Sequence, residues 1–168
     1  VKKTHMKIDY LINNAGIASM NHSLLTPISM VEKIFKTNVF GTFIFCRESA
    51  KLMKKKNFGR IVNFGSIAVP IKLEGEAIYA ASKSAVHNLT QILAREYSSY
   101  GITVNAIAPT LVKTDLIKRI PDEKKERLLQ KLAIPKYTKI NDITNVIDFF
   151  IKKQSFLVTG QILYLGGP

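Results

Sequence analysis

The sequence has a single cysteine, no tryptophan and no apolar run long enough to cross a bilayer. Because Cys46 has no second cysteine to pair with, an intramolecular disulfide is excluded, which favours a reducing, cytoplasmic setting. The longest apolar runs, such as residues 38–46, fall well short of the roughly 20 residues that a transmembrane helix needs. No membrane association is therefore expected, and no signal-peptide pattern is present, although the chain begins at Val1 rather than Met.

Acidic residues are also scarce, since 12 of them face 25 lysines and arginines and the net charge is +13. Such an excess can indicate nucleic-acid binding. The lysines are scattered, however, and they do not alternate with aromatic residues. We therefore expect them to lie on solvated helix faces, and no nucleic-acid partner is expected. One basic run, Lys54–Lys56, could attract an anionic substrate such as a phosphorylated sugar or an acidic carrier protein if it lies near a cleft.

The 168 residues, 46% of them hydrophobic and 22% charged, predict one globular domain over residues 1–168. Apolar runs at 8–12, 61–66, 102–108 and 161–165 predict strands, and helical spacing predicts helices over 29–56, 76–99 and 141–151. Residues 111–135 are polar and predict helical structure that is interrupted at Pro121 and Pro135. Ser29 with Glu32 predicts a capping box, and Gly101 predicts a helix C-cap.

Strands that alternate with helices and are apolar throughout predict a parallel sheet covered on both faces. The expected fold class is α/β, a three-layer Rossmann-like sheet. Ligands of such sheets bind beyond the carboxyl ends of the strands. Asn13, Ser66 and Pro109 each follow a predicted strand, so they are expected to meet at one crevice.

Tyr79 and Lys83 lie four residues apart, which places them one turn apart on the same face of the predicted helix. An ammonium beside a phenol favours the phenolate and lowers the pKa of the tyrosine. The tyrosine can then exchange a proton with a reacting oxygen. Ser66 would supply a hydroxyl to hold that oxygen, so the three residues predict redox chemistry between carbonyls and alcohols.

Several polar residues have simpler interpretations when each is taken alone. His87 is expected to be structural, because no metal partner is spaced for it and no metal site is predicted, and Cys46 is expected in the core. Glu74 and Glu76 precede Tyr79 closely and could contact a polar substrate, but solvated loop charges are the favoured interpretation.

Five motifs in order resemble the short-chain dehydrogenase/reductases over essentially the whole chain, and the 3-oxoacyl-acyl-carrier-protein reductase group is the nearest general type. The motifs are Asn13-Asn14-Ala15-Gly16, Asn38-Val39-Phe40-Gly41, Ser66 with Tyr79 and Lys83, Ile102–Asn105 leading to Pro109 and Thr114, and Thr159-Gly160-Gln161 with Gly166-Gly167.

The resemblance implies an NAD(P)-dependent oxidoreductase that reduces a carbonyl or oxidises an alcohol. It implies that Tyr79 is the general acid/base, that Lys83 assists it and contacts the nicotinamide ribose, that Ser66 orients the carbonyl and that Asn38 binds a relay water. It also implies a homo-oligomer, dimer or tetramer, and a small-molecule substrate, with an anionic or carrier-bound compound as one option. The implied cofactor-binding residues for NADP or NAD are Asn13, Ala15, Gly16, Tyr79, Lys83, Pro109, Val112 and Thr114.

Two departures from the family pattern are visible. Thr110 follows Pro109 where the family usually has glycine. The Gly-rich turn that binds the pyrophosphate is absent, so the chain is expected to be a carboxy-terminal portion that lacks the first three strands and the adenosine half. Residues 1–7 would then end a preceding helix, and strand 8–12 would be an unprotected sheet edge.

A non-catalytic remnant that serves as an oligomerisation or partner-binding module is the alternative hypothesis. A sugar epimerase of the extended type shares the Tyr79 and Lys83 spacing, but the chain leaves no room for its substrate domain.

Overall fold

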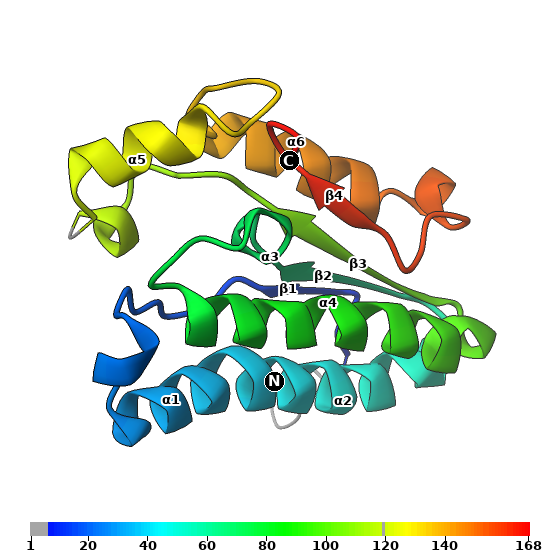
Figure 1. Cartoon of the computed structure of the whole chain (residues 1–168). Helices are drawn as coiled ribbons and strands as arrows, with labels where there is room; N and C mark the ends of the chain where they lie inside the picture. Colours follow the sequence, from blue (N-terminus) through cyan, green and yellow to red (C-terminus); the bar gives the residue numbers. More distant parts are fainter. Residues whose placement is uncertain (1–6, 119) are drawn as a thin grey trace.

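The computed structural model describes residues 7–118 and 120–168, in which a four-stranded parallel sheet forms the centre. The strands are β1 (Tyr10–Asn13), β2 (Gly59–Phe64), β3 (Ile102–Ala108) and β4 (Ile162–Tyr164), and they lie in the order β1-β2-β3-β4 (Figure 1). In register, Ile61 pairs with Val104 and Ala106 pairs with Ile162. The predicted parallel sheet is confirmed.

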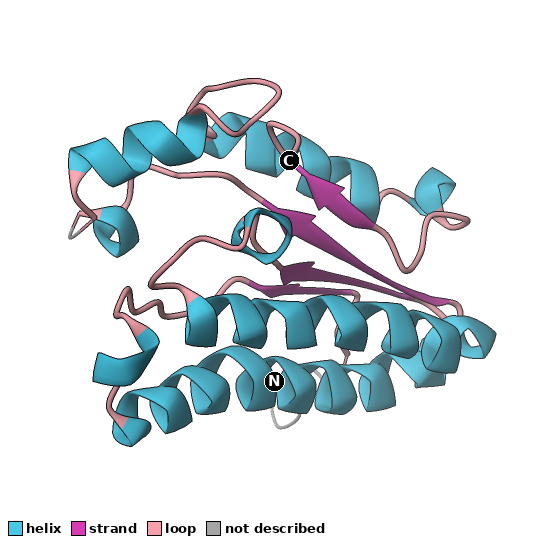
Figure 2. Ribbon diagram, in the orientation of Figure 1, coloured by secondary structure: helices cyan, strands magenta, loops and turns pink. Residues whose placement is uncertain are grey.

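Helices cover both faces of this sheet, as Figure 2 shows. On one face lie α1 (Ile28–Phe35), the π-helical segment η2 (Lys36–Gly41), α2 (Thr42–Met53) and α4 (Ala77–Tyr97). On the other face α6 (Ile140–Ile151) packs against β2 and β3. The shorter helices α3 (Ala68–Ile71) and α5 (Asp122–Leu129) follow β2 and β3 in the chain. The three-layer architecture is therefore as predicted.

The central strands β2 and β3 are buried on both faces, which explains why they are apolar throughout. Ile61 and Val104 face α2 and α4, where they pack with Met53 and Leu93. The alternate residues of these strands face α6. On that side Val62 and Ile107 pack with Phe150 of α6 in a second core cluster. No helix in the described part of the chain is both long and apolar enough to span a membrane.

The predicted capping box at Ser29 and Glu32 is wrong. Helix α1 begins at Ile28, and Pro27 occupies the N-cap without any side-chain capping bond. The predicted single helix over 29–56 is helical throughout, but the π-helical turns of η2 interrupt it at the motif residue Asn38. A wider turn of this kind is rare and is found frequently at functional sites.

Lys54–Lys56 form η3, which precedes the amino end of β2. The crevice is at the opposite, carboxyl end of this strand, so the hypothesis that these lysines face the mouth of the site is wrong. Lys54 Nζ lies 4.0 Å from the centroid of the Tyr100 ring, and Lys56 Nζ lies 3.7 Å from Asp9 Oδ1. Because this run directly precedes the strand in the sequence, it lies near the amino end of the strand.

The predicted C-cap at Gly101 is confirmed, since this residue ends the turn Ser98–Tyr100 with a φ of 65°. A Cβ added there would lie 2.2 Å from the carbonyl oxygen of Asn57. Glycine is therefore required both for the left-handed conformation and for the close approach of the two chain segments.

Strand β1 is an edge strand of the described sheet, because β2 is its only neighbour among residues 7–118 and 120–168. Tyr10 and Ile12 are 48% and 37% exposed. The edge expected in this region is thus observed. The expected helix end at residues 1–7 falls almost entirely outside the described residues.

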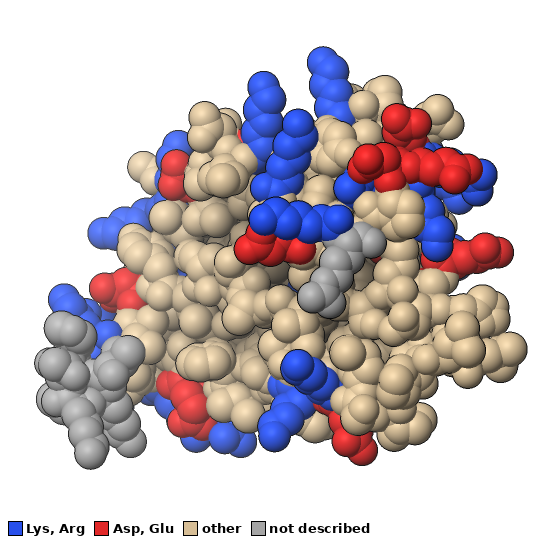
Figure 3. Space-filling view, turned by 90° about the vertical axis from the view of Figure 1, so that its left-hand side faces the viewer, with Lys and Arg blue, Asp and Glu red and all other residues tan. Residues whose placement is uncertain are grey.

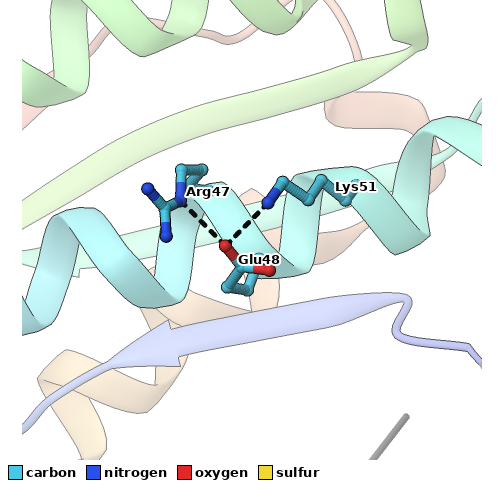
Figure 4. A network of polar contacts seen from close by, with 3 residues as sticks. All are labelled: Arg47, Glu48 and Lys51. Carbon is cyan, nitrogen blue, oxygen red and sulfur yellow. Dashed lines mark hydrogen bonds and ion pairs between the residues drawn. The ribbon is translucent and has the colours of Figure 1, made fainter.

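The outer surface of α2 carries a small ionic network (Figure 4). Glu48 Oε1 accepts hydrogen bonds from Arg47 Nε and Lys51 Nζ, each at 2.8 Å. These bonds lower the pKa of the Glu48 carboxyl. Because all three side chains are exposed, we expect these ion pairs to contribute little to the stability of the fold.

Candidate active site

Two cavities meet at Tyr79, at the carboxyl ends of β2 and β3. The first, here called the Lys83 cavity, has a volume of about 370 Å³ and is lined by Asn14, Gly16, Lys83 and residues of α6. The second, here called the Ser66 cavity, has about 110 Å³ and is lined by Ser66, Ile67 and Glu76. Tyr79 lines both, as do Gly65, Pro109, Val112, Thr114 and Leu116.

Tyr79 and Lys83 come from the first turns of α4 and project toward the end of β2, as their spacing predicts. Lys83 is buried, and its Nζ donates a 2.8 Å hydrogen bond to the carbonyl oxygen of Phe64. The same nitrogen lies 5.9 Å from the centroid of the Tyr79 ring. Helix α4 therefore delivers a phenol and an amine to one place.

The expected lowering of the Tyr79 pKa by Lys83 is wrong for this structure. Burial raises the pKa of the Tyr79 phenol, the Ser66 hydroxyl opposes that rise through a hydrogen bond, and the Glu76 carboxylate adds to it. Burial also lowers the pKa of Lys83 from 10.5 to about 8. The helical spacing revealed that the two groups are neighbours, but the cost of burying each charge could not be seen in it.

Ser66 follows β2 and is held by its backbone and its hydroxyl. Its Oγ accepts a 3.1 Å hydrogen bond from the Ala68 amide, and its own N–H donates to His87 Nε2 at 3.4 Å. His87 is buried and stacks edge-on against Tyr164, with 5.8 Å between ring centroids. Burial, together with Lys83, lowers the pKa of His87 to about 4. The imidazole is thus neutral and structural, as expected.

Gly65 leaves the space that the His87 ring occupies. A Cβ at this position would lie 2.1 Å from His87 Nε2. We expect Gly65→Ala to lower the free energy of unfolding by about 1–3 kcal/mol, because the imidazole must move and release the Ser66 amide. Urea denaturation of the variant measures this loss.

Gly41→Ala is the matched control, since its Cβ would meet only the Lys36 carbonyl oxygen at 3.7 Å. Adding His87→Ala to Gly65→Ala should recover part of the loss, because the smaller side chain makes room for the methyl group. Unchanged stability of Gly65→Ala would contradict the role given to the imidazole.

Asn38 lies in η2 and is buried, and its side chain ties the loop after β1 to α4. Oδ1 accepts from the Ile17 amide at 2.9 Å, while Nδ2 donates to the Ile17 carbonyl at 2.9 Å and to Ser82 Oγ at 3.0 Å. A Cβ on Gly16 would lie 3.4 Å from both Asn38 Oδ1 and Lys83 Nζ. Asn38, Gly16 and Lys83 are therefore brought together.

The motif after β1 divides between the core and the crevice. The Asn13 side chain turns inward and donates to Asn63 Oδ1 at 2.8 Å and to Cys46 Sγ at 3.2 Å. Burial raises the pKa of the Cys46 thiol to about 12, which fits its predicted core position. Asn14, which was not singled out from the sequence, lines the Lys83 cavity together with Gly16. Ala15 is exposed and is not among the lining residues.

Pro109, Val112 and Thr114 all line both cavities, as expected for residues that follow β3. The unusual Thr110 is buried and ties this loop to a later segment. Its Oγ1 lies 2.6 Å from Thr138 Oγ1, and its methyl group would meet a Cβ on Gly166 at 2.8 Å. A threonine in place of the family glycine thus forms a side-chain contact between two loops.

Glu76 is not a solvated loop charge, so that interpretation is wrong, whereas Glu74 is exposed as expected. Glu76 is only 7% exposed and lies in the wall of the Ser66 cavity. Burial raises the pKa of its carboxyl to about 6. No local pattern of residues indicates this burial, because the cavity is also lined by residues distant in the chain, such as Leu111 and Ile120.

The residues of the Lys83 cavity fit the nicotinamide end of a dinucleotide. Gly16 lies in the cavity wall beside Lys83, whose Nζ would be the donor to a ribose hydroxyl. The remaining wall is apolar, with Ile140 and Ile143 from α6, and suits a flat ring.

The chain is similar to known proteins over almost its whole length. A family model described as enoyl-(acyl carrier protein) reductase matches residues 1–167. The 3-oxoacyl-[acyl-carrier-protein] reductase of Rickettsia bellii (strain RML369-C) is 36% identical over 161 residues, which are 96% of this chain and 67% of that protein. The same enzyme of Staphylococcus aureus (strain Mu50) is 32% identical over 160 residues, 95% of this chain and 65% of that protein.

Solved structures are similar as well. An NAD⁺-bound xylitol dehydrogenase matches with a TM-score of 0.87 at 27% identity, covering 99% of this chain and 71% of that one. A protein described as a short chain dehydrogenase/reductase family protein matches with a TM-score of 0.89 at 27% identity, covering 99% of this chain and 69% of that one. The chain spans about two thirds of the length of the relatives that it matches. With the family model covering nearly every residue, the chain belongs to the short-chain dehydrogenase/reductase family and resembles its 3-oxoacyl-carrier-protein reductases.

Proposed function

We propose that the protein is an NAD(P)-dependent oxidoreductase that interconverts a carbonyl and an alcohol, with Asn38, Ser66, Tyr79 and Lys83 as its catalytic set. The observation that carries the proposal is the position of Tyr79 at the boundary between the Lys83 and Ser66 cavities. A cofactor in the first cavity and a substrate in the second would both contact this phenol. The bound nicotinamide supplies or accepts the hydride, and the protein supplies position and proton transfer.

In the reducing direction the Ser66 hydroxyl donates to the substrate oxygen and holds it beside Tyr79. The Tyr79 hydroxyl then gives its proton to that oxygen as the carbonyl carbon accepts the hydride. Lys83 would supply the proton that restores the phenol, since a pKa of about 8 lets its amine give up and regain a proton near neutral pH. Asn38, which lies beside Lys83 at Gly16, would position the water that connects this amine to solvent.

A groove beside the Ser66 cavity supports the expectation that the substrate carries an anionic group. The groove has a volume of about 270 Å³ and shares Leu111, Ile120 and Leu128 with that cavity. Its charged lining residues are one acidic residue, Glu74, and five basic ones, Lys72, Lys124, Lys125, Arg127 and Lys131. Figure 3 looks onto the face to which the strands point, where lysine and arginine side chains gather in the upper half. This groove, rather than Lys54–Lys56, would receive a phosphate or an acidic carrier protein.

Homo-oligomer formation through the α1–α2 layer is supported by the apolar side chains on its outer surface. Phe40 and Phe45 are 59% and 61% exposed. This surface would serve equally if the chain were a non-catalytic binding module, which is the second candidate function.

Calorimetric titration with NADH and NADPH, followed by a spectroscopic turnover assay with a panel of ketones and aldehydes, separates the two candidates. Micromolar binding of either nucleotide and consumption of the reduced form with a carbonyl are expected for the oxidoreductase. The absence of both, in a protein that is folded and oligomeric, would instead support the binding module.

A further inference from the structure

The wall of the Ser66 cavity contains one carboxyl group in surroundings that are otherwise mostly apolar. Glu76 faces a space lined by Ile67, Leu116, Ile117 and Ile120, and the remaining lining residues that the structure describes carry no formal charge. A carboxylate in such surroundings is costly unless it is hydrogen-bonded. It is therefore unusual here and needs a reason.

No described residue supplies a hydrogen bond to the buried Oε2 atom of Glu76. Glu76 is the N-cap residue of the 21-residue helix α4, and its backbone carbonyl accepts a hydrogen bond from the Ala80 amide. Its side chain, however, makes no capping hydrogen bond to the helix. The side chain therefore leaves the free amides of the helix uncapped, and Glu76 lies in the same cavity wall as Ser66 and Tyr79.

The position of Glu76 works against the proposed proton transfer. Its negative charge raises the pKa of Tyr79, which lies one helical turn further along α4. An uncharged residue would leave the phenol easier to ionise. A carboxylate beside the general acid is understandable if it is used to bind the substrate.

We propose that Glu76 is a specificity-determining residue that accepts a hydrogen bond from a hydroxyl or amino group of the substrate, close to the carbon that reacts. This inference rests on the proposed function, and it narrows the substrate class to hydroxylated or aminated carbonyl compounds and their alcohols. An ionised carboxylate can only accept hydrogen bonds, so a substrate with a methyl group at this place would leave the Glu76 carboxylate without a donor. A hydrogen bond to a charged group in a buried site corresponds to a preference of about 10- to 100-fold.

The test compares three secondary alcohols that differ in one group: butan-2-ol, propane-1,2-diol and 1-aminopropan-2-ol. Oxidation of each is measured with wild type, Glu76→Gln and Glu76→Leu. We expect wild type to favour the diol or the amino alcohol over butan-2-ol by about 10- to 100-fold in kcat/KM. Glu76→Leu should abolish or reverse this preference. Glu76→Gln keeps the shape of the side chain without its charge and should retain only a weak preference for the diol. This variant provides the test if Glu76→Leu does not fold.

Glu96→Gln is the matched control, because Glu96 is exposed at the far end of the same helix. Equal use of the three alcohols by wild type, or an unchanged preference in Glu76→Leu, would overturn the inference. If the diol is preferred, its hydroxyl donates a hydrogen bond to the Glu76 carboxylate; if the amino alcohol is preferred, its ammonium pairs with that carboxylate.

A second readout does not depend on turnover. The side-chain carboxyl carbon of Glu76, labelled with ¹³C and assigned by its absence in Glu76→Gln, is followed by NMR as each alcohol is added. We expect a shift with the diol or amino alcohol and none with butan-2-ol. This shift without any oxidation would overturn the proposed function and leave the role of Glu76 standing, whereas its absence would overturn that role.

Discussion

Replacing Tyr79 with phenylalanine is expected to lower turnover by about 10²- to 10⁴-fold, the range that a positioned general acid contributes. Tyr79 lines both cavities, so removal of its hydroxyl leaves no general acid between cofactor and substrate in the proposed mechanism. The ring remains and continues to fill the wall of both cavities. Turnover is measured by the absorbance of the reduced nicotinamide, and the affinity for the nucleotide by calorimetry.

The Tyr97→Phe variant is the control for this experiment, because Tyr97 ends the same helix and packs against the core cluster of Cys46 and Leu93. Its turnover should match that of wild type. Nucleotide affinity should change by less than threefold in Tyr79→Phe, which would show that the loss concerns proton transfer and not binding. Turnover of Tyr79→Phe close to that of wild type would remove Tyr79 from the mechanism.

The parts of the fold that the sequence predicted are those governed by local periodicity and strand burial. Strands β2 and β3 are apolar runs because both faces of the sheet are covered, and Tyr79 and Lys83 meet because a helix repeats every 3.6 residues. The predicted ends of strands are less accurate: β2 was expected at 61–66 and lies about two residues earlier, because hydrogen bonding to the neighbouring strands determines where pairing stops.

What could not be predicted depends on contacts between distant segments. Glu76 is buried in the wall of a cavity that it shares with residues following β3, and its charge then affects Tyr79. The interruption of the first long helix at Asn38 also lacks a local signal, because apolar spacing is the same for a helix with or without a π-helical turn.

Replacing Lys83 with methionine is expected to abolish turnover and, at the same time, to change how stability depends on pH. Lys83 is only 6% exposed, and burial lowers its pKa from 10.5 to about 8. Below pH 8 the folded protein carries a buried ammonium, which destabilises it relative to the unfolded chain. Between pH 8 and 10.5 the folded state releases this proton while the unfolded state still holds it, so the contribution of Lys83 to stability improves as the pH rises.

The difference in unfolding free energy between Lys83→Met and wild type therefore depends on pH. At pH 7 the variant avoids a penalty of about 3 kcal/mol, although the Phe64 carbonyl loses its donor at a cost of about 1–3 kcal/mol. From about pH 7 to about pH 9.5 the advantage of the variant should fall by about 2 kcal/mol, because wild type sheds its buried charge. Urea denaturation at the two pH values measures this change.

Comparing the two proteins at each pH removes the contributions of other titrating groups. The raised pKa values of Cys46 and Tyr79 lower stability at alkaline pH, but they do so in both proteins. Lys55→Met, a change of an exposed lysine in η3, should show no pH-dependent difference from wild type. If Lys83→Met likewise showed the same difference at both pH values, Lys83 would not be a buried amine of lowered pKa. The proton supply from Lys83 to Tyr79 that depends on this property would then be excluded.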